Sequence, residues 1–197
     1  MAFWNRNKDP EPVKIEKEPG LWKDILSTLL HLALLVGFVI FFLTCIGQRV
    51  EVVGNSMEDT LHNHDQLIVD CFTYRFLHAP ERQDIVVFRL KDDPGTFYVK
   101  RVIGLPGETV RIKNSVIYIN GEAIDDPYAT QKTFPAGSAE DLIVLGEDEY
   151  FVMGDNRNNS LDSRYSLGSV KRSQVVGRAW VRIWPFENRG SLTSGER

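Results

Sequence analysis

The chain has 197 residues, of which 43% are hydrophobic and 25% charged, a balance that suits one globular domain with an additional segment. The formal net charge is −4, so the chain lacks the basic excess typical of nucleic-acid binding. Two cysteines (Cys45 and Cys71) and four scattered histidines argue against a disulfide framework and a zinc site. We therefore expect no metal, no other cofactor and no nucleic-acid partner.

The first predicted element is an apolar helix over residues 25–47. These residues include no Asp, Glu, Lys or Arg, and about 20 such residues are enough to cross the bilayer core. A buried core helix would show polar residues at helical spacing, and Leu32 to Leu43 shows none. A cleaved leader has a shorter apolar core and a small-residue exit, which is absent around residues 44–47. We expect a retained transmembrane anchor.

Basic residues on the two sides of this segment predict its orientation. Only Arg49 lies between the segment and Tyr74, whereas five basic residues precede it: Arg6, Lys8, Lys14, Lys17 and Lys23. The positive-inside rule places residues 1–24 in the cytoplasm as a polar tail and residues 48–197 on the outer face of the membrane. The lipid bilayer is thus an expected partner, crossed once.

After residue 48 the sequence consists mainly of short strand-like runs separated by turns. The runs are residues 66–74, 85–90, 97–103, 110–112, 116–119, 150–153 and 175–183. Lys113-Asn114-Ser115 and Asn120-Gly121 are turn signals. Residues 125–148 are mixed, and we expect a long loop with one short strand there. The pattern predicts an all-β outer domain, a barrel or a sandwich.

The stretch GNSMEDTL, residues 54–61, places Ser56 directly after the first strand-like residues of the outer domain. A serine hydroxyl is a weak nucleophile until a neighbouring base takes its proton. Lys100 is the lysine best placed to be that base, because a strand puts it on one face with Tyr98 and Val102, and Arg101 on the other. Apolar surroundings would lower its pKa. The other interpretation of Lys100 is an edge-strand lysine that prevents aggregation.

A histidine is the alternative base. His62 and His64 are close to Ser56 in sequence, but they lie in the polar patch His62-Asn63-His64-Asp65, which indicates a turn. A serine–histidine–aspartate arrangement therefore stays open at this point.

Four stretches of the chain, taken together, resemble the conserved boxes of type I signal peptidases (peptidase family S26). They are GNSMEDTL, RQDIVVF (residues 82–88), YVKRVIGLPGE (residues 98–108) and GDNRNNSLDSR (residues 154–164). The short tail, single anchor and compact outer domain resemble the Gram-positive form. The resemblance implies the β-rich signal peptidase fold, placement in the plasma membrane, and removal of signal peptides from secretory preproteins after small residues.

The resemblance also implies roles for individual residues. Ser56 would be the nucleophile, its backbone N–H an oxyanion donor, and Lys100 the general base. Ser160 would supply the hydroxyl that orients the lysine amine. Asp162 and Arg164 would form a supporting ion pair, and Asp155 would be a structural carboxylate near the site.

Two positions depart from the usual pattern of the family. Asp59 stands where many members have proline, which removes a fixed φ angle and predicts a looser turn. Gly54 stands where some members have a serine that helps the oxyanion hole. The second oxyanion donor would then be a backbone group or water.

Substrate is expected to bind as an extended peptide along the strands that precede Ser56 and Lys100, residues 50–55 and 96–99. The residues expected to contact it are Val52, Gly54, Asn55, Met57, Ile85, Tyr98 and Val99. Two rival functions fit parts of the sequence: a self-cleaving serine–lysine peptidase of the repressor type, and a non-enzymatic membrane-tethered β scaffold. The anchor argues against the first, which is a soluble class.

Overall fold

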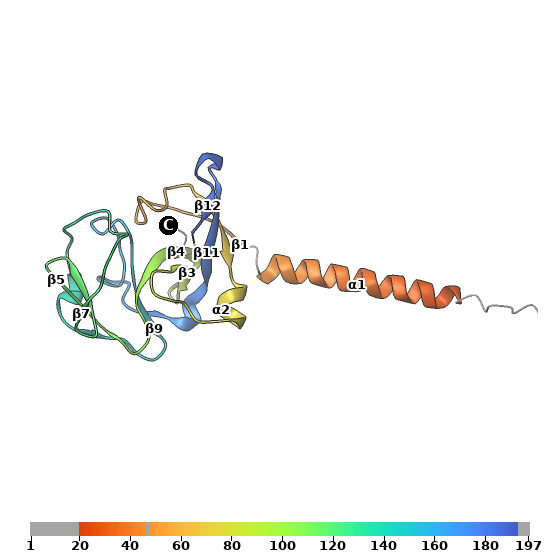
Figure 1. Ribbon diagram of the computed structural model, residues 1–197, viewed down its shortest axis with the longest axis horizontal. Coiled ribbons are helices and arrows are strands. Elements are labelled where there is room, and N and C mark those ends of the chain that lie inside the picture. The colour runs from red at the N-terminus through yellow and green to blue at the C-terminus, as the bar shows by residue number, and fades with distance from the viewer. Residues whose placement is uncertain (1–19, 46–47, 193–197) are drawn as a thin grey trace, which may run out of the picture. The chain divides into compact units, whose positions relative to one another are not determined.

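The computed structural model describes residues 20–45 and 48–192, and the chain divides into two compact units, residues 1–40 and 41–197. Helix α1 spans Leu21–Cys45 (Figure 1). Its segment from Leu21 to Phe41 has a mean hydropathy of 2.2 and is not buried by other parts of the protein. The helix is thus long and apolar enough to cross a membrane.

The helix begins four residues before the predicted start. Leu21 and Trp22 extend the apolar run, and Asp24 is well tolerated in a first turn, where the helix dipole favours negative charge. Residues 21–24, predicted as the end of the tail, therefore belong to the helix. The rest of that tail, residues 1–19, and the predicted end of the anchor at residues 46–47 lie outside the described residues.

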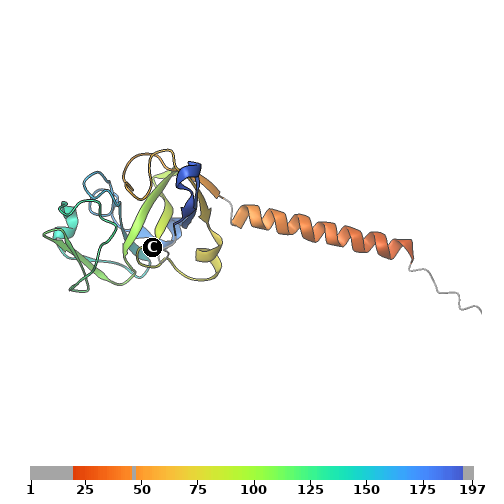
Figure 2. The same ribbon diagram turned by 45° about the horizontal axis from the view of Figure 1, so that its top comes forward.

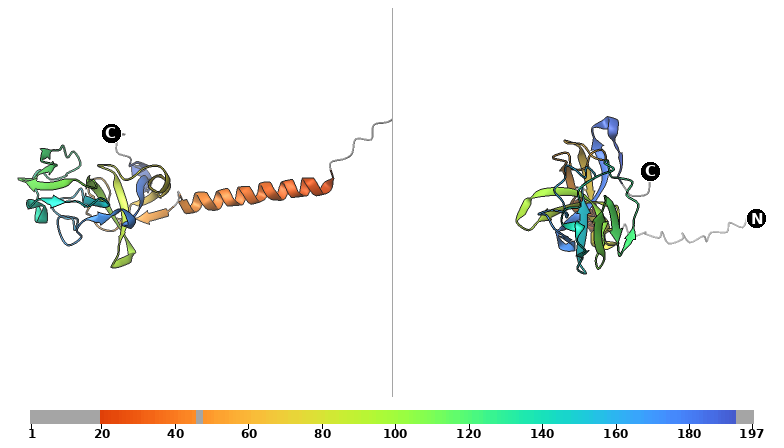
Figure 3. Two further views of the ribbon diagram at one scale, coloured as in Figure 1. Left: turned by 90° about the horizontal axis from the view of Figure 1, so that it is seen from below. Right: turned by 90° about the vertical axis from the view of Figure 1, so that its left-hand side faces the viewer.

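The second unit contains a large antiparallel sheet whose strands follow the order β1-β2-β11-β3-β4-β9-β10, with β12 also paired to β11 (Figures 1 and 2). Its strands are β1 Gln48–Glu51, β2 Gln66–Asp70, β3 Ile85–Leu90, β4 Asp93–Gly104, β9 Glu149–Met153, β10 Val170–Lys171, β11 Val175–Trp184 and β12 Gly190–Ser191. The β3–β4 hairpin projects from the body of this unit (Figure 3).

A smaller antiparallel sheet lies to one side of the large one, in the order β7-β6-β5-β8 (Figure 1). It consists of β5 Thr109–Lys113, β6 Val116–Ile119, β7 Glu122–Ala123 and β8 Ile143–Val144, and β5 and β6 form the predicted hairpin. Residues 125–148 form a long connection containing the 3-10 turn η1 (Gly137–Glu140) and the short strand β8. Two further 3-10 turns are η2 (Arg172–Gln174) and η3 (Phe186–Asn188). The expected all-β domain with one N-terminal apolar helix is confirmed.

One predicted strand is wrong in its second half. The run from Gln66 was expected to continue to Tyr74, but β2 ends at Asp70 and the short helix α2 spans Phe72–Phe76. The Asp70 carboxylate accepts hydrogen bonds from the N–H and the hydroxyl of Thr73, at 3.0 and 2.6 Å. This side-chain capping of a turn competes with continued strand pairing.

Candidate active site

Ser56 lies in a turn that is anchored on both sides. Its neighbours Met57 and Leu61 are buried in the same cluster as Val50 and Val52, and the Leu61 N–H donates to the Met57 carbonyl at 2.8 Å. Gly54 has a φ of +91°, which favours glycine, and its N–H donates to Asn63 Oδ1 at 2.8 Å. The apolar neighbours hold the turn on the core while Ser56 itself stays partly exposed.

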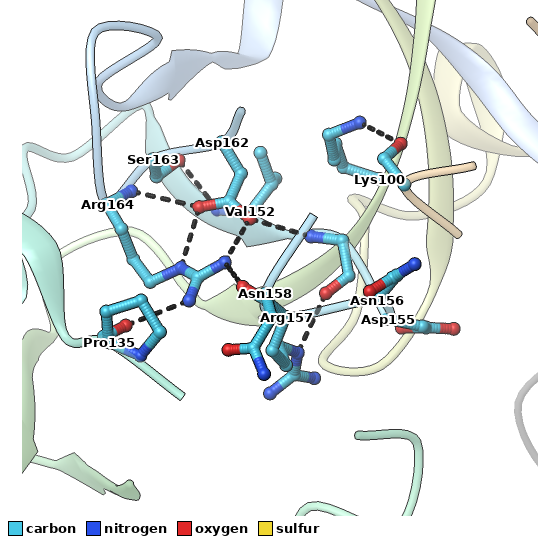
Figure 4. Close-up of polar contacts among 12 residues, drawn as sticks. Lys100, Pro135, Val152, Asp155, Asn156, Arg157, Asn158, Asp162, Ser163 and Arg164 are labelled. Carbon is cyan, nitrogen blue, oxygen red and sulfur yellow. Dashed lines mark hydrogen bonds and ion pairs between the residues drawn. The ribbon is translucent and has the colours of Figure 1, made fainter. Parts of the chain in front are cut away.

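Lys100 lies on β4, paired through Val86 of β3, and its side chain is buried with only 5% exposure. Its Nζ is 2.7 Å from Ser56 Oγ (Figure 4). The same Nζ is 3.1 Å from the carbonyl oxygen of Val99. The structure therefore brings together the two residues that the sequence selected 44 positions apart.

The electrostatic setting of Lys100 favours the neutral amine. Burial lowers its pKa from 10.5 to about 8, against the opposing effect of the Asp162 and Asp155 carboxylates, which raise it. With a pKa of about 8, roughly a tenth of the amines are neutral at pH 7, against well under a thousandth for an exposed lysine. The neutral amine can accept the hydroxyl proton of Ser56.

Asp162 and Arg164 form a fully buried ion pair, with Arg164 Nη2 2.9 Å from Asp162 Oδ2 (Figure 4). The Asp162 carboxylate also accepts the Gly154 N–H at 3.0 Å. Arg164 donates further to the carbonyls of Pro135 and Arg157, at 2.9 and 2.7 Å. The pair thus closes the loop of residues 154–164 on itself and ties it to the long connection before β9.

Asp155 is fully buried and forms an ion pair with Arg101, the residue after Lys100, through two hydrogen bonds of 2.8 and 2.6 Å. It also accepts the Thr60 hydroxyl at 2.6 Å. Asp155 therefore joins the strand of Lys100 to the turn of Ser56, and the ring of Tyr128 lies over the Arg101 guanidinium at 3.6 Å.

Ser160 lines the same cleft as Ser56 and Lys100, but its hydroxyl does not make the expected contact with the Lys100 amine. Its Oγ has no hydrogen-bond partner among the described residues, although the side chain is buried. It packs instead against Gly154, where an added Cβ would lie 2.3 Å from Ser160 Oγ and 2.3 Å from the Ser56 carbonyl oxygen. Lys100 directs its amine to Ser56 and Val99 in this structure.

A cleft of about 500 Å³ opens over these residues. It is lined by Val53, Gly54, Asn55, Ser56, Tyr98, Lys100, Asn158, Asn159, Ser160, Leu161 and Tyr165. Of the residues expected to contact substrate, Gly54, Asn55 and Tyr98 are on this wall. The other four, Val52, Met57, Ile85 and Val99, are buried in the core cluster and are not among the residues that line this cleft. Their contact with substrate stays a prediction.

Comparison with known proteins assigns the chain to a family. The family model described as "Signal peptidase, peptidase S26" matches residues 23–184. The chain belongs to this family. A probable signal peptidase I-2 of Synechocystis sp. is 37% identical over 186 residues, covering 91% of the chain and 82% of that protein. Signal peptidase I S of Bacillus subtilis is 38% identical over 184 residues, covering 89% and 95%.

Among solved structures, the peptidase is similar to a crystal structure of a signal peptidase I from Enterococcus faecalis. The sequence identity is 37%, the TM-score is 0.41, and the match covers 50% of the chain and 95% of the other. The family membership makes the chain a signal-peptide-removing serine peptidase, of a family that acts on secretory preproteins and is membrane-associated. The non-enzymatic scaffold interpretation is therefore wrong.

His62 and His64, the two histidines near Ser56 in sequence, are both exposed. His64 is exposed and pairs with Glu51 at 2.7 Å, and neither His64 nor His62 lines the cleft. Within residues 20–45 and 48–192, no group of three His, Cys, Asp or Glu side chains could hold a metal ion.

Sequence reasoning missed the residues of the peptidase that support the site from residues 125–148. Asp126 forms an ion pair with Arg157 through two hydrogen bonds, one of them 2.8 Å long, and Arg157 in turn donates to the Gly154 carbonyl at 2.8 Å. Asp126 lies 31 residues from Arg157, in a segment without periodicity. An aspartate followed by proline there gave no signal beyond that of a turn.

Proposed function

We propose that this chain cleaves signal peptides from secretory preproteins after small residues, with Ser56 as nucleophile and Lys100 as general base. The observation that carries the proposal is the 2.7 Å contact between a hydroxyl on the cleft wall and a buried amine whose pKa is lowered to about 8. A nucleophile within hydrogen-bond reach of a suitably tuned base is the arrangement that acyl transfer requires.

In the proposed reaction, the neutral Lys100 amine takes the Ser56 proton as Oγ attacks the scissile carbonyl carbon. The carbonyl oxygen becomes an oxyanion, which the Ser56 backbone N–H stabilises. The lysine ammonium then gives its proton to the leaving amine, and the peptide bond breaks to leave an ester on Ser56. Water, deprotonated by the same amine, attacks this ester, and Ser56 leaves with the proton from Lys100.

The second oxyanion donor is not the N–H of Gly54, because that group already donates to Asn63 Oδ1. A serine at position 54 would also be strained by the φ of +91°. The Asp59 turn keeps its hydrogen bond from Leu61 to Met57, so loss of the usual proline leaves the turn closed.

The substrate strand is proposed to pair with the first half of β4. On one edge, Asp93, Tyr98 and Val99 pair with β3, whereas on the other edge β9 pairs with Arg101, Val102 and Gly104. Among the described residues, no strand pairs with the first half of β4 on that second edge, which suits an extended peptide. Tyr98, which lines the cleft beside Lys100, would then limit the size of the side chain next to the cleaved bond.

The test is cleavage of a purified preprotein by the full chain in detergent. Ser56→Ala and Lys100→Met are expected to lose at least about a thousandfold in kcat/KM, whereas the exposed Lys113→Met is expected to keep the wild-type value. Full activity of Lys100→Met would overturn the dyad. Loss on changing His62 or His64 alone would favour a histidine base, and cleavage of the chain itself with no cleavage of added preprotein would favour the repressor type.

A further inference from the structure

The connection before β9, residues 125–148, contacts the loop of residues 154–164 at several points. Its anchoring contacts are made by Asp126, Thr133, Pro135 and Ser138, which hold Arg157, Asn158 and Arg164. Between these anchors lies Gln131, a partly buried residue whose side-chain amide contacts the loop at two points.

Asn156 connects this loop to the nucleophile. Its backbone N–H donates to the Ser56 carbonyl at 3.1 Å, and its side-chain Nδ2 donates to the Asn55 carbonyl at 3.1 Å. One residue therefore holds the carbonyl oxygens on both sides of the Ser56 Cα.

The Asn55 carbonyl accepts the Asn156 amide and, at 3.3 Å, the Glu58 N–H, and these contacts help to set where the Ser56 N–H points. The peptide group between Asn55 and Ser56 is planar, with its C=O and N–H directed in opposite senses. Holding the oxygen toward Asn156 therefore aims the N–H away from it. Within the part of the chain that the structure describes, the Ser56 N–H donates no hydrogen bond, so it is available for the oxyanion of the proposed reaction.

The orientation of the Asn156 amide depends on Gln131. Gln131 Nε2 donates to Asn156 Oδ1 at 3.1 Å, and Gln131 Oε1 accepts the Asn158 N–H at 3.3 Å. Because the Asn158 N–H can only donate, it fixes Oε1 on its own side and leaves Nε2 facing Asn156. Asn156 then presents its oxygen to Gln131 and its Nδ2 to the Asn55 carbonyl.

We propose that Gln131 is a positioning residue that aims the Ser56 backbone N–H at the oxyanion by orienting the Asn156 amide. The inference rests on the proposed function, which makes that N–H an oxyanion donor. Gln131 touches neither Ser56 nor Lys100 in this scheme and acts only through Asn156.

The decisive variant is Gln131→Glu. Its carboxylate can still accept the Asn158 N–H, but it presents an acceptor to Asn156, whose amide must turn and place its oxygen against the Asn55 carbonyl. We expect kcat to fall about tenfold with KM unchanged, because the lost alignment matters in the transition state and not in substrate binding. The matched control is the neighbouring exposed Lys132→Gln, which makes the same change of −1 in charge and should keep wild-type kinetics.

Two further measurements separate positioning from general support. In an Asn156→Ala background, Gln131→Glu should cost nothing more, because the partner through which it acts is gone. Amide hydrogen exchange in a fragment covering residues 54–61, followed by mass spectrometry, should be faster in Gln131→Glu than in wild type or Lys132→Gln. This second readout does not require that the preprotein be cleaved.

The outcomes distinguish the inference from the function on which it rests. Wild-type cleavage with an unchanged kcat in Gln131→Glu would overturn the inference and leave the function standing. Additive losses in the Asn156→Ala background would also overturn it. If wild-type protein cleaved no preprotein, the proposed function would fail, and unchanged exchange at residues 54–61 would then overturn the positioning role as well.

Discussion

Two opposing influences set the pKa of the Lys100 amine. Burial in the domain removes water from the amine and favours the neutral form, whereas the nearby Asp162 and Asp155 carboxylates favour the ammonium. Desolvation has the larger effect, and the pKa settles at about 8. Near pH 8 about half of the amines are therefore neutral, as the proposed role of Lys100 as a general base requires.

The pH dependence of cleavage follows from this pKa. Because the proposed reaction requires the neutral amine, kcat/KM should rise with pH, with an apparent pKa of about 8, and level off above it. A fluorogenic signal-peptide substrate assayed between about pH 6 and pH 10 at constant ionic strength would measure it. A profile that levels off near the ordinary pKa of histidine, about 6.5, would contradict a lysine base.

The contribution of Lys100 to stability should change with pH in the same sense as activity. The folded-state pKa of about 8 lies below 10.5, so the contribution of Lys100 to stability is full above pH 10.5 and is lost as the pH falls toward 8. At pH 7, Lys100→Met removes this cost and fills the same volume, so we expect Tm to rise by a few degrees while cleavage is lost.

Thermal unfolding of the detergent-solubilised chain at pH 7 would measure this gain, with the exposed Lys113→Met as the control expected to keep the wild-type Tm. A lower Tm for Lys100→Met would show that the amine stabilises the folded state, contrary to the desolvation argument.

At the scale of elements, the loop of residues 154–164 is held by ion pairs that water does not reach. Asp162→Asn leaves the Arg164 guanidinium buried without its counter-charge. Removing one partner of a buried pair costs about 3–5 kcal/mol. We expect that loss in the free energy of unfolding, measured by urea denaturation, together with loss of cleavage.

The exposed pair of Glu51 with His64 gives the matched comparison for Asp162→Asn. Glu51→Gln should change the free energy of unfolding by less than about 1 kcal/mol, since solvent screens an exposed pair. Equal losses in the two variants would mean that burial of the Asp162 pair does not set its strength.

Apolar runs and turn residues in the sequence were enough to predict several strands and one hairpin. A short run of apolar and β-branched residues indicated β3, and the Lys113-Asn114-Ser115 turn indicated the β5–β6 hairpin. The five-residue helix α2 was missed because its apolar residues also fit a strand, and only the Asp70 cap distinguishes the two. The residue types that such chemistry needs made Ser56 and Lys100 candidates, and the resemblance to type I signal peptidases implied their roles.

The support of the site could not be predicted in the same way. Arg101 was expected only to point away from Lys100, and its partner Asp155 lies 54 residues further along the chain. Gln131 and Asn156 meet across 25 residues. Such pairs depend on tertiary packing, which leaves no periodic trace in a single sequence.

At the scale of the whole molecule, the N-terminal tail and the outer domain should lie on opposite sides of the membrane. The basic residues before α1 predict that residues 48–197 are outside the cell and residues 1–19 inside. Protease added to intact spheroplasts should degrade the outer domain and leave an N-terminal tag intact. Inverted membrane vesicles should give the reverse pattern, and protection of the outer domain in spheroplasts would contradict the orientation.

The meeting of distant segments at Gly154 constrains when the peptidase can first become active. The carbonyl of Ser56 lies so close to Gly154 that only a hydrogen atom fits between them, and Asn156 reaches back 101 residues to Asn55. Ser56 and Lys100, the proposed nucleophile and base, are synthesised before the loop of residues 154–164 that supports them. We expect a nascent or truncated product that ends before residue 154 to carry both Ser56 and Lys100 without their alignment. Such a product would have no peptidase activity while it is inserted into the membrane.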